Sequence, residues 1–508
     1  MSLTNLSTSQ KTAQFFLPAA FVHDTEENYQ ILENLIREEG IGGVTFFHSR
    51  HSAAANFEKR AEVLDVSGTL EKMIGLINRY QAASKIPLLM SIDGEYGLAM
   101  RIEKTPHYPF AISLGAMQND AENLVEEVGY RMGLDMKMSG IHLNLAPCAD
   151  INTNPNNPVI GYRSFGTDPE KVAKLAFANY TGMIKAGIGA CFKHFPGHGD
   201  TAVDSHLGLP IIHKTKADLI AEELLPFQYG IDHGVELIMV GHLAVPTLTR
   251  GKNIPASISK EIITDLLKGE MGFKGLVISD ALNMKAVAKH FPAPGKLELE
   301  AFKAGNDLLC FSDHVKEGIA QISENCSEAE IDAVYQKIIA LKEKLGVFEF
   351  SELAIPTFDW EEHSQVQTKL AKEYIQILSG SLEPATIKGI AAKEALAHRT
   401  FFEKGKSTFT KELDKKFGYK LRKLPLEKSD LILISIHVPS HKPLNQFGMD
   451  QEILNEIKDL IDSKSYILIH FGNPLALKHF GDLKNCQAVI CCYQGFEEVQ
   501  EVAARLFD

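Results

Sequence analysis

The sequence has no long apolar run, no excess of positive charge and few cysteines, and each absence excludes a class of protein. The apolar segment 15–21 is far shorter than the stretch of about 20 residues that a membrane-spanning helix needs. The formal net charge is −13 at pH 7, whereas nucleic-acid binders usually present a basic face. We therefore expect neither a membrane span nor a nucleic-acid partner.

The chain has seven cysteines, an odd number, with no CxxC pair and no spacing typical of a disulfide framework. Most of them lie in apolar runs, so we expect buried free thiols and no structural zinc site. Residues 1–7 lack a basic region followed by an apolar core, and no signal peptide is predicted. On this sequence the expected compartment is the cytoplasm, or the periplasm or exterior if a leader has been removed.

The 508 residues are enough for two or three domains, and eight short apolar runs predict strands. Segments with helical spacing lie between these runs, and the alternation predicts parallel strands joined by crossovers. We expect an α/β fold in which a (β/α)8 TIM-type barrel precedes a smaller α/β domain; an open doubly wound sheet is the alternative. The predicted strands are 15–20, 42–48, 87–93, 142–150, 189–195, 236–242, 275–280 and 305–312.

The predicted barrel domain covers residues 1–350 and ends in an amphipathic helix at 327–345. Ser327 and Glu330 have the form of a capping box, which marks the start of that helix. A polar, proline-containing stretch follows, and we place a linker and a connecting helix at 351–380. Residues 381–508 form the expected C-terminal α/β domain, and the sequence leaves open whether the native chain continues past Asp508.

Many predicted strands end in an ionisable residue, and in a barrel these ends meet at one mouth, which holds the active site. Polar residues that merely mark where strands meet water would account for one or two such positions. They account poorly for three aspartates and a Lys-His pair. The residues concerned are His48, Asp93, Asp150, Lys193 with His194, His242 and Asp280.

The segment 193–206 is the richest in chemistry, with three histidines, one lysine and two aspartates beside two glycines and a proline. Proline and glycine exclude a helix interior, so we expect a loop of fixed shape that leaves a buried strand. Asp204 stands two residues before His206 and can accept a hydrogen bond from imidazole Nδ1, which leaves Nε2 to move a proton. A polar surface loop with incidental histidines is the alternative.

Asp280 ends the apolar run 275–279, where a carboxylate can act as a nucleophile, a metal ligand or a base. An N-cap for a helix that starts near Asn283 is the alternative. Carboxylate and cationic groups that suit sugar hydroxyls come from other strand ends and loops, although each could be a structural salt bridge. They are Asp93, Arg101, Arg163, Lys193 and His194.

A catalytic metal would have to draw on the histidines and aspartates already named. No HxH or HExxH element stands on a strand end or helix, so we expect no metal and no other cofactor. The residues that such a site would use are His194, His198, His206, Asp204 and Asp280.

The sequence from Lys193 to Gly199, KHFPGHG, followed by Asp204-Ser205-His206, resembles the signature of glycoside hydrolase family 3. It is most similar to the bacterial β-N-acetylglucosaminidase branch, and the resemblance covers residues 10–350. Further motifs agree in order along the chain: Asp93-x-Glu95-x-Gly97 with Arg101, Arg163-Ser164-Phe165-Gly166, and Ser279-Asp280-Ala281-Leu282-x-Met284. One departure is Tyr96-Gly97, where the family usually has two glycines, and it bears on the aglycone preference.

The resemblance implies a role for each matched residue. Asp280 would be the catalytic nucleophile, and His206, paired with Asp204, the acid/base. The first sugar subsite would be formed by Asp93, Arg101, Arg163, Lys193 and His194.

The implied activity is that of a retaining exo-β-N-acetylglucosaminidase. Its substrate would be a small GlcNAc-containing glycan, such as a peptidoglycan-derived muropeptide or a chitin-like fragment. A family 3 β-glucosidase is the nearest alternative, although such members generally take their acid/base from the second domain. A non-catalytic carbohydrate-binding protein and a metal-dependent hydrolase are the alternatives from other classes.

Overall fold

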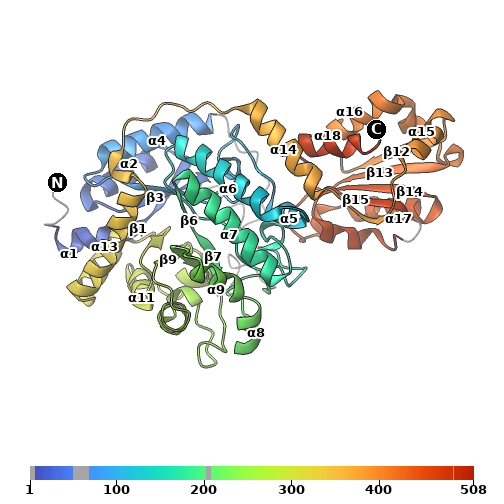
Figure 1. Cartoon of the computed structure of the whole chain (residues 1–508). Helices are drawn as coiled ribbons and strands as arrows, with labels where there is room; N and C mark the ends of the chain where they lie inside the picture. The colour runs from blue at the N-terminus through green and yellow to red at the C-terminus, as the bar shows by residue number, and fades with distance from the viewer. Residues whose placement is uncertain (1–5, 50–67, 202–207, 484–485) are drawn as a thin grey trace. The chain divides into compact units, whose positions relative to one another are not determined.

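The structure is a computed structural model that describes residues 6–49, 68–201, 208–483 and 486–508 (Figure 1). The chain divides into two compact units, each described here by itself. The first comprises Met1–Tyr108, Glu122–Asn154 and Thr167–Phe358, and the second comprises Pro109–Ala121, Pro155–Gly166 and Asp359–Asp508. Two short segments of the N-terminal half are therefore built into the C-terminal unit.

Over the described residues, the first unit contains ten short strands that occupy eight positions in the barrel. β1 and β2 share one position, and β6 and β7 share another. Each of the eight predicted strands overlaps one of these positions, which confirms the α/β alternation. The strands are β1 (Phe16–Leu17), β2 (Ala19–His23), β3 (Gly43–Ser49), β4 (Leu89–Ile92), β5 (Leu143–Asn144), β6 (Gly189–Ala190), β7 (Phe192–Phe195), β8 (Leu237–Val240), β9 (Leu276–Ser279) and β10 (Leu309–Cys310).

All pairings in this unit are parallel, in the orders β2-β3-β4-β5-β6 and β7-β8-β9. Ser279 N donates to Leu308 O at 3.0 Å, which attaches β9 to the strand of β10. That strand pairs with β1 through Phe16 and Leu309. Within the described residues, hydrogen bonds thus join eight strand positions into a ring, the barrel that the sequence predicts.

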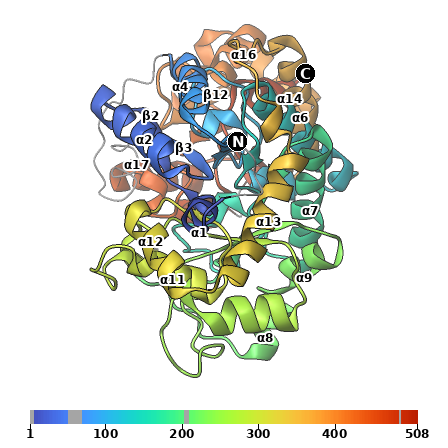
Figure 2. The ribbon, with the colours of Figure 1, turned by 90° about the vertical axis from the view of Figure 1, so that its left-hand side faces the viewer.

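Helices surround these strands, as the end-on view in Figure 2 shows for α2, α4, α6, α7, α9, α11 and α12. Local sequence sets their ends: α7 has Asp168 as its N-cap, Pro169 at its first position and a left-handed Gly187 after its last. The capping box of Ser327 and Glu330 opens α13 as predicted. The helices are α1 (Thr8–Ala13), α2 (Glu26–Glu39), α4 (Thr69–Ala83), α6 (Ala121–Met138), α7 (Pro169–Ala186), α8 (Lys216–Ala221), α9 (Leu225–Asp232), α10 (Lys285–Ala288), α11 (Lys296–Ala304), α12 (Val315–Asn325) and α13 (Glu328–Lys344).

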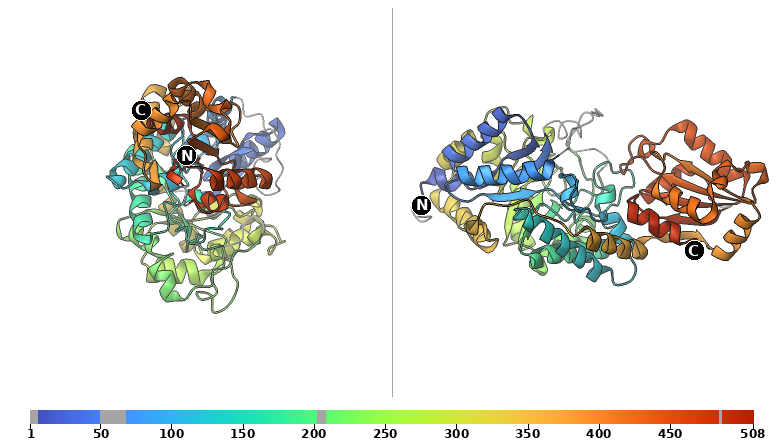
Figure 3. Two further views of the ribbon diagram at one scale, coloured as in Figure 1. Left: turned by 90° about the vertical axis from the view of Figure 1, so that its right-hand side faces the viewer. Right: turned by 90° about the horizontal axis from the view of Figure 1, so that it is seen from above.

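The second unit is a five-stranded sheet of order β11-β15-β14-β13-β12, in which β11 is antiparallel to β15 and the other pairs are parallel. Helices lie on both faces of this sheet (Figure 3). Its elements include α5 (Ala111–Ala116), α14 (Trp360–Tyr374), β11 (Gln376–Gly380), α15 (Pro384–Ala392), β12 (Leu396–Phe401), α16 (Thr408–Phe417), β13 (Leu431–His437), α17 (Gln451–Ser463), β14 (Tyr466–Phe471), β15 (Cys486–Cys491) and α18 (Glu497–Arg505).

Alternation along β13 divides the core of this second unit between the two faces of the sheet. Ile432, Ile434 and Ile436 pack with the apolar side of α17, including Leu454 and Ile457. The segment around α5 is far from the rest of this unit in the sequence, and hydrogen bonds attach it there. Gln494 Oε1 accepts from Phe110 N and from Ser113 Oγ, both at 3.0 Å.

Two predictions about the whole chain can be compared with these coordinates. All seven cysteines are free thiols, and five of them are buried, as expected. Among the described residues, no helix combines the length and the apolar character that crossing a bilayer requires.

Candidate active site

A buried lysine stands at the centre of the site, on β7. Lys193 is 2% exposed, and its ammonium group contacts Asp93 Oδ1 at 2.5 Å and Glu95 Oε1 at 2.7 Å. Arg101 Nη2 contacts the other oxygen, Asp93 Oδ2, at 2.6 Å, and its guanidinium lies 3.9 Å from the ring centre of Phe47. The charges of the two cations and the two carboxylates balance. These residues therefore form salt bridges, which was the alternative left open by the sequence, and salt bridges do not exclude sugar binding.

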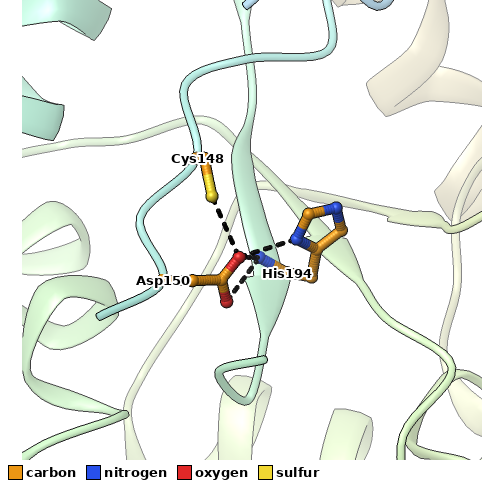
Figure 4. Close-up of side chains that lie close together, drawn as sticks. All are labelled: Cys148, Asp150 and His194. Carbon is orange, nitrogen blue, oxygen red and sulfur yellow. Dashed lines mark hydrogen bonds and ion pairs between the residues drawn. The ribbon is translucent and has the colours of Figure 1, made fainter. Parts of the chain in front are cut away.

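A fully buried carboxylate, Asp150, organises the turn that follows Lys193. Its oxygens accept from His194 N at 3.2 Å, from His198 N at 2.6 Å and from Cys148 Sγ at 3.1 Å. The same carboxylate lies 2.7 Å from His194 Nδ1, and Figure 4 shows the other ring nitrogen turned away from Asp150. The pair thus fixes the imidazole ring, with the Nδ1 proton on the side of the carboxylate.

Burial on its own raises the pKa of the Asp150 carboxyl. The charge of His194 and the hydrogen bond from its ring outweigh burial, with help from His198 and Cys148, and hold the pKa well below its usual range. Asp150 is therefore an anion at neutral pH.

The glycines of the predicted loop are required by its shape. Gly197 has φ of +116°, a conformation that side chains rarely adopt, and a Cβ there would lie 2.6 Å from the Cβ of Glu223. A Cβ on Gly199 would lie 1.5 Å from Ile151 O, so no side chain fits. The turn is therefore packed directly on the strand end that carries Asp150.

Asp280 directly follows β9 and is partly exposed. Its backbone N donates to Val240 O at 3.0 Å, and its Oδ1 accepts from Ala281 N at 2.7 Å. The alternative of an N-cap is wrong, because the next helix, α10, begins at Lys285 and is preceded by Met284.

Asp280 and Asp93 lie at the same end of the barrel, because they directly follow the parallel strands β9 and β4. Burial raises the pKa of Cys310 to about 12, a hydrogen bond with Thr45 opposes this, and the charges of Asp280 and Asp93 raise the pKa further.

His242, another residue predicted at a strand end, has a structural role. It is fully buried, with Nδ1 2.6 Å from Ser257 Oγ and Nε2 2.8 Å from Ala281 O. Both ring nitrogens are thus engaged, and the second contact holds the backbone directly after Asp280.

The predicted site residues fall into three groups. Asp93, Lys193, His194 and Asp280 lie on or directly after barrel strands, and Arg101, which follows the 3-10 helix Leu98–Met100, joins them through Asp93.

Arg163 belongs to the second unit, where its Nη1 donates to Val159 O at 3.2 Å. Asp204 and His206 lie outside the described residues, so the predicted acid/base pair remains a prediction, as do the roles of all the others.

Three residues of the site had no role in the sequence prediction: Glu95, Asp150 and Cys148. Glu95 lies within the D-x-E motif, and its spacing from Asp93 was the available signal. Asp150 stands at the end of a predicted strand, so the sequence predicted its place at the active-site end of the barrel but not its hydrogen-bond partners.

Comparison with known proteins identifies the family. The sequence model of the glycosyl hydrolase family 3 N-terminal domain matches residues 7–341. The chain belongs to glycosyl hydrolase family 3. The β-hexosaminidase of Stenotrophomonas maltophilia is 31% identical over 291 residues, which are 56% of this chain and 80% of that protein. β-Hexosaminidase A of Pseudoalteromonas piscicida is 30% identical over 368 residues, 67% of this chain and 60% of that protein.

The solved structures agree on the fold of this family 3 chain. A family 3 β-N-acetylglucosaminidase from Paenibacillus sp. str. FPU-7 has a TM-score of 0.77 at 23% identity, over 99% of this chain and 97% of that one. A β-glucoside phosphorylase has a TM-score of 0.79 at 20% identity, over 99% and 93%. Barrel and α/β domain are thus shared, and the prediction of a family 3 glycoside hydrolase related to β-N-acetylglucosaminidases is confirmed.

Proposed function

We propose that this family 3 chain is a retaining exo-β-N-acetylglucosaminidase that releases terminal GlcNAc from peptidoglycan-derived or related glycans. The observation that carries the proposal is the network of Lys193, Asp93 and Arg101 on the same barrel end as Asp280. A fixed set of donors and acceptors beside a strand-end carboxylate suits a sugar ring whose anomeric carbon faces that carboxylate. The names of the curated relatives support the choice of an N-acetylhexosaminide.

In the proposed reaction His206, as an imidazolium oriented by Asp204, protonates the glycosidic oxygen while Asp280 attacks the anomeric carbon. The bond to the leaving group breaks, and a glycosyl ester forms on Asp280 with inverted configuration. Neutral His206 then takes a proton from water, whose attack on the same carbon releases Asp280 and restores the original configuration. A histidine thus replaces the second carboxyl group that most glycosidases use.

The proposed roles of the other residues follow from their contacts. Asp93 is held by two cations, and its carboxylate oxygens can accept from hydroxyl groups of the sugar. His194, fixed by Asp150, faces the substrate with Nε2. Both positions would bind the sugar in the ground state and the transition state.

The test compares Asp280→Asn with Asp265→Asn, which alters an exposed aspartate on the helix Glu261–Glu270. We expect the first variant to lose hydrolysis of nitrophenyl β-GlcNAc by a factor on the order of 10⁴ or more, and the second to keep it. A 5-fluoro GlcNAc donor, which keeps the 2-acetamido group, should label Asp280 in the unaltered chain, as peptide mass spectrometry would show. Labelling of another residue would contradict the assigned nucleophile.

The alternatives are separated in the same experiments. A family 3 β-glucosidase would turn over the nitrophenyl glucoside faster than the GlcNAc derivative. A carbohydrate-binding protein would bind GlcNAc without turnover of either substrate. Comparison of a GlcNAc–anhydromuramyl fragment with chitobiose would then define the aglycone.

A further inference from the structure

A cluster of three different metal-ligand types lies on the Nδ1 side of the His194 ring (Figure 4). Cys148, Asp150 and His194 are all buried, and their Sγ, carboxylate and ring nitrogen atoms lie within 4.8 Å of one another. We propose that these three side chains form a binding site for a thiophilic divalent cation of the Zn²⁺ class, and that its occupation inhibits the enzyme. The site shares only His194 with the catalytic metal site weighed in the sequence, which would also have used His198, His206, Asp204 and Asp280.

The geometry is close to what such an ion requires. Zn²⁺ takes sulfur at about 2.3 Å and nitrogen or oxygen at about 2.0–2.2 Å, which sets tetrahedral ligands roughly 3.3–3.6 Å apart. Asp150 Oδ2 is now 2.7 Å from His194 Nδ1 and 3.1 Å from Cys148 Sγ, because protons lie between these atoms. Replacing the protons by the ion requires the ligands to separate by about half an ångström, which side-chain rotation can supply.

The charges and protons balance. Asp150 is already an anion, the thiol of Cys148 must release its proton to solvent, and His194 must bind the ion through Nδ1. If His194 starts as the neutral Nδ1–H form, its proton moves to Nε2 and one proton is released per ion bound. Thiolate, carboxylate and divalent cation then sum to zero, which suits a buried position.

The ligand types select the class of ion. Thiolate and imidazole favour Zn²⁺, Co²⁺ and Cd²⁺, whereas Mg²⁺ and Ca²⁺ prefer oxygen ligands. Occupation would break the hydrogen bond between Asp150 and His194 and would change the ring that faces the sugar. Only this inhibitory consequence depends on the proposed function; binding of the ion does not.

The experiment titrates the full chain, first freed of metals with a chelator, with Co²⁺ and with Zn²⁺. Bound Co²⁺ should show a near-ultraviolet thiolate charge-transfer band and intense visible bands of a tetrahedral ion. Cys148→Val should abolish the charge-transfer band and weaken Zn²⁺ binding, measured by calorimetry, at least tenfold. The matched control is Cys191→Val, which removes another buried thiol next to β7 and should keep both signals.

Circular dichroism and the thermal midpoint would establish that both variants fold. Absence of the charge-transfer band in the unaltered chain, or equal Zn²⁺ affinity in Cys148→Val, would overturn the site. Inhibition is then measured on nitrophenyl β-GlcNAc, with each variant compared with its own chelator-treated activity. Zn²⁺ that binds at this cluster without slowing hydrolysis would overturn the inhibitory role, and a chain with no hydrolysis would refute the proposed function while the spectra still decide the site.

Discussion

Replacing Asp150 by asparagine should lower kcat/KM for a GlcNAc glycoside roughly 5- to 150-fold while the chain still folds. Asparagine has nearly the same shape as aspartate and keeps one acceptor oxygen. That oxygen can take the place of Oδ1 and accept from the backbone N–H groups of His194 and His198. The amide nitrogen then occupies the place of Oδ2, 2.7 Å from His194 Nδ1.

The magnitude follows from this one contact. An amide N–H2 at the position of Oδ2 forces Nδ1 of His194 to accept, so the ring proton moves to Nε2 and the sugar-facing nitrogen changes from acceptor to donor. The donor at Nε2 leaves the sugar hydroxyl without its acceptor; a buried polar group left unsatisfied costs about 1–3 kcal/mol, and about 1.4 kcal/mol is a factor of ten in rate. Loss of one such interaction on the sugar gives the stated range.

Steady-state hydrolysis of nitrophenyl β-GlcNAc measures the effect on kcat/KM, and ¹⁵N NMR of labelled histidine reports which nitrogen of His194 carries the proton. Cys148→Val is the matched control, because it removes only the weak S–H donor to Asp150 and leaves the Nδ1 contact in place. A purely structural role for Asp150 would lower the thermal midpoint without moving the proton. Wild-type kcat/KM together with an unchanged Nδ1–H signal in Asp150→Asn would refute the reasoning.

Two further predictions concern buried lysines. Lys193→Met removes the cation between Asp93 and Glu95 and should lower the free energy of unfolding, measured by chemical denaturation, by about 3–5 kcal/mol. The double variant with Glu95→Gln should recover part of this loss, because it removes one of the two carboxylates left without their cation. Lys342 on α13 is fully buried, and burial lowers its pKa to about 7, so the unfolded chain binds more protons between pH 7 and the ordinary pKa of 10.5. The stability of the unaltered chain relative to Lys342→Met should therefore rise by about 2 kcal/mol from pH 7 to 8.5, and a difference that stays flat in denaturation at both pH values would contradict this.

The barrel was predictable because its strands are buried on both faces. Such strands are continuous apolar runs bounded by polar residues, a pattern that the sequence shows eight times. The active-site end of the barrel was also predictable, because ionisable residues stand where the apolar runs end. The ends of the strands themselves were not, because β5 and β6 have only two paired residues each within longer apolar runs.

The second unit was harder to predict, since its outer strands carry weak signals. β11 is largely exposed and pairs only with β15, so it has no buried face to produce a pattern. β12 contains His398 and Arg399 within its six residues, which interrupts the apolar run. The central strands β13, β14 and β15 are largely buried and have the continuous apolar runs that give a stronger signal.

The pairing of Asp150 with His194 could not be read from spacing, because it depends on the register of two strand positions. β5 and β6 start with Leu143 opposite Gly189. If that register continued, Asp150 would stand opposite Pro196 and could not reach the ring of His194.

The register changes along these strands, and the change creates the site. Cys148 bridges to Lys193, which is one residue short of the starting register, and the carboxylate of Asp150 then reaches both the ring and the backbone N–H of His194. A buried carboxylate that accepts four hydrogen bonds stabilises this irregular turn, whereas a regular ladder would leave no such pocket. Local sequence specifies each strand, but only the packed barrel specifies the slip between them, and the residues that hold the slip also fix the ring of His194.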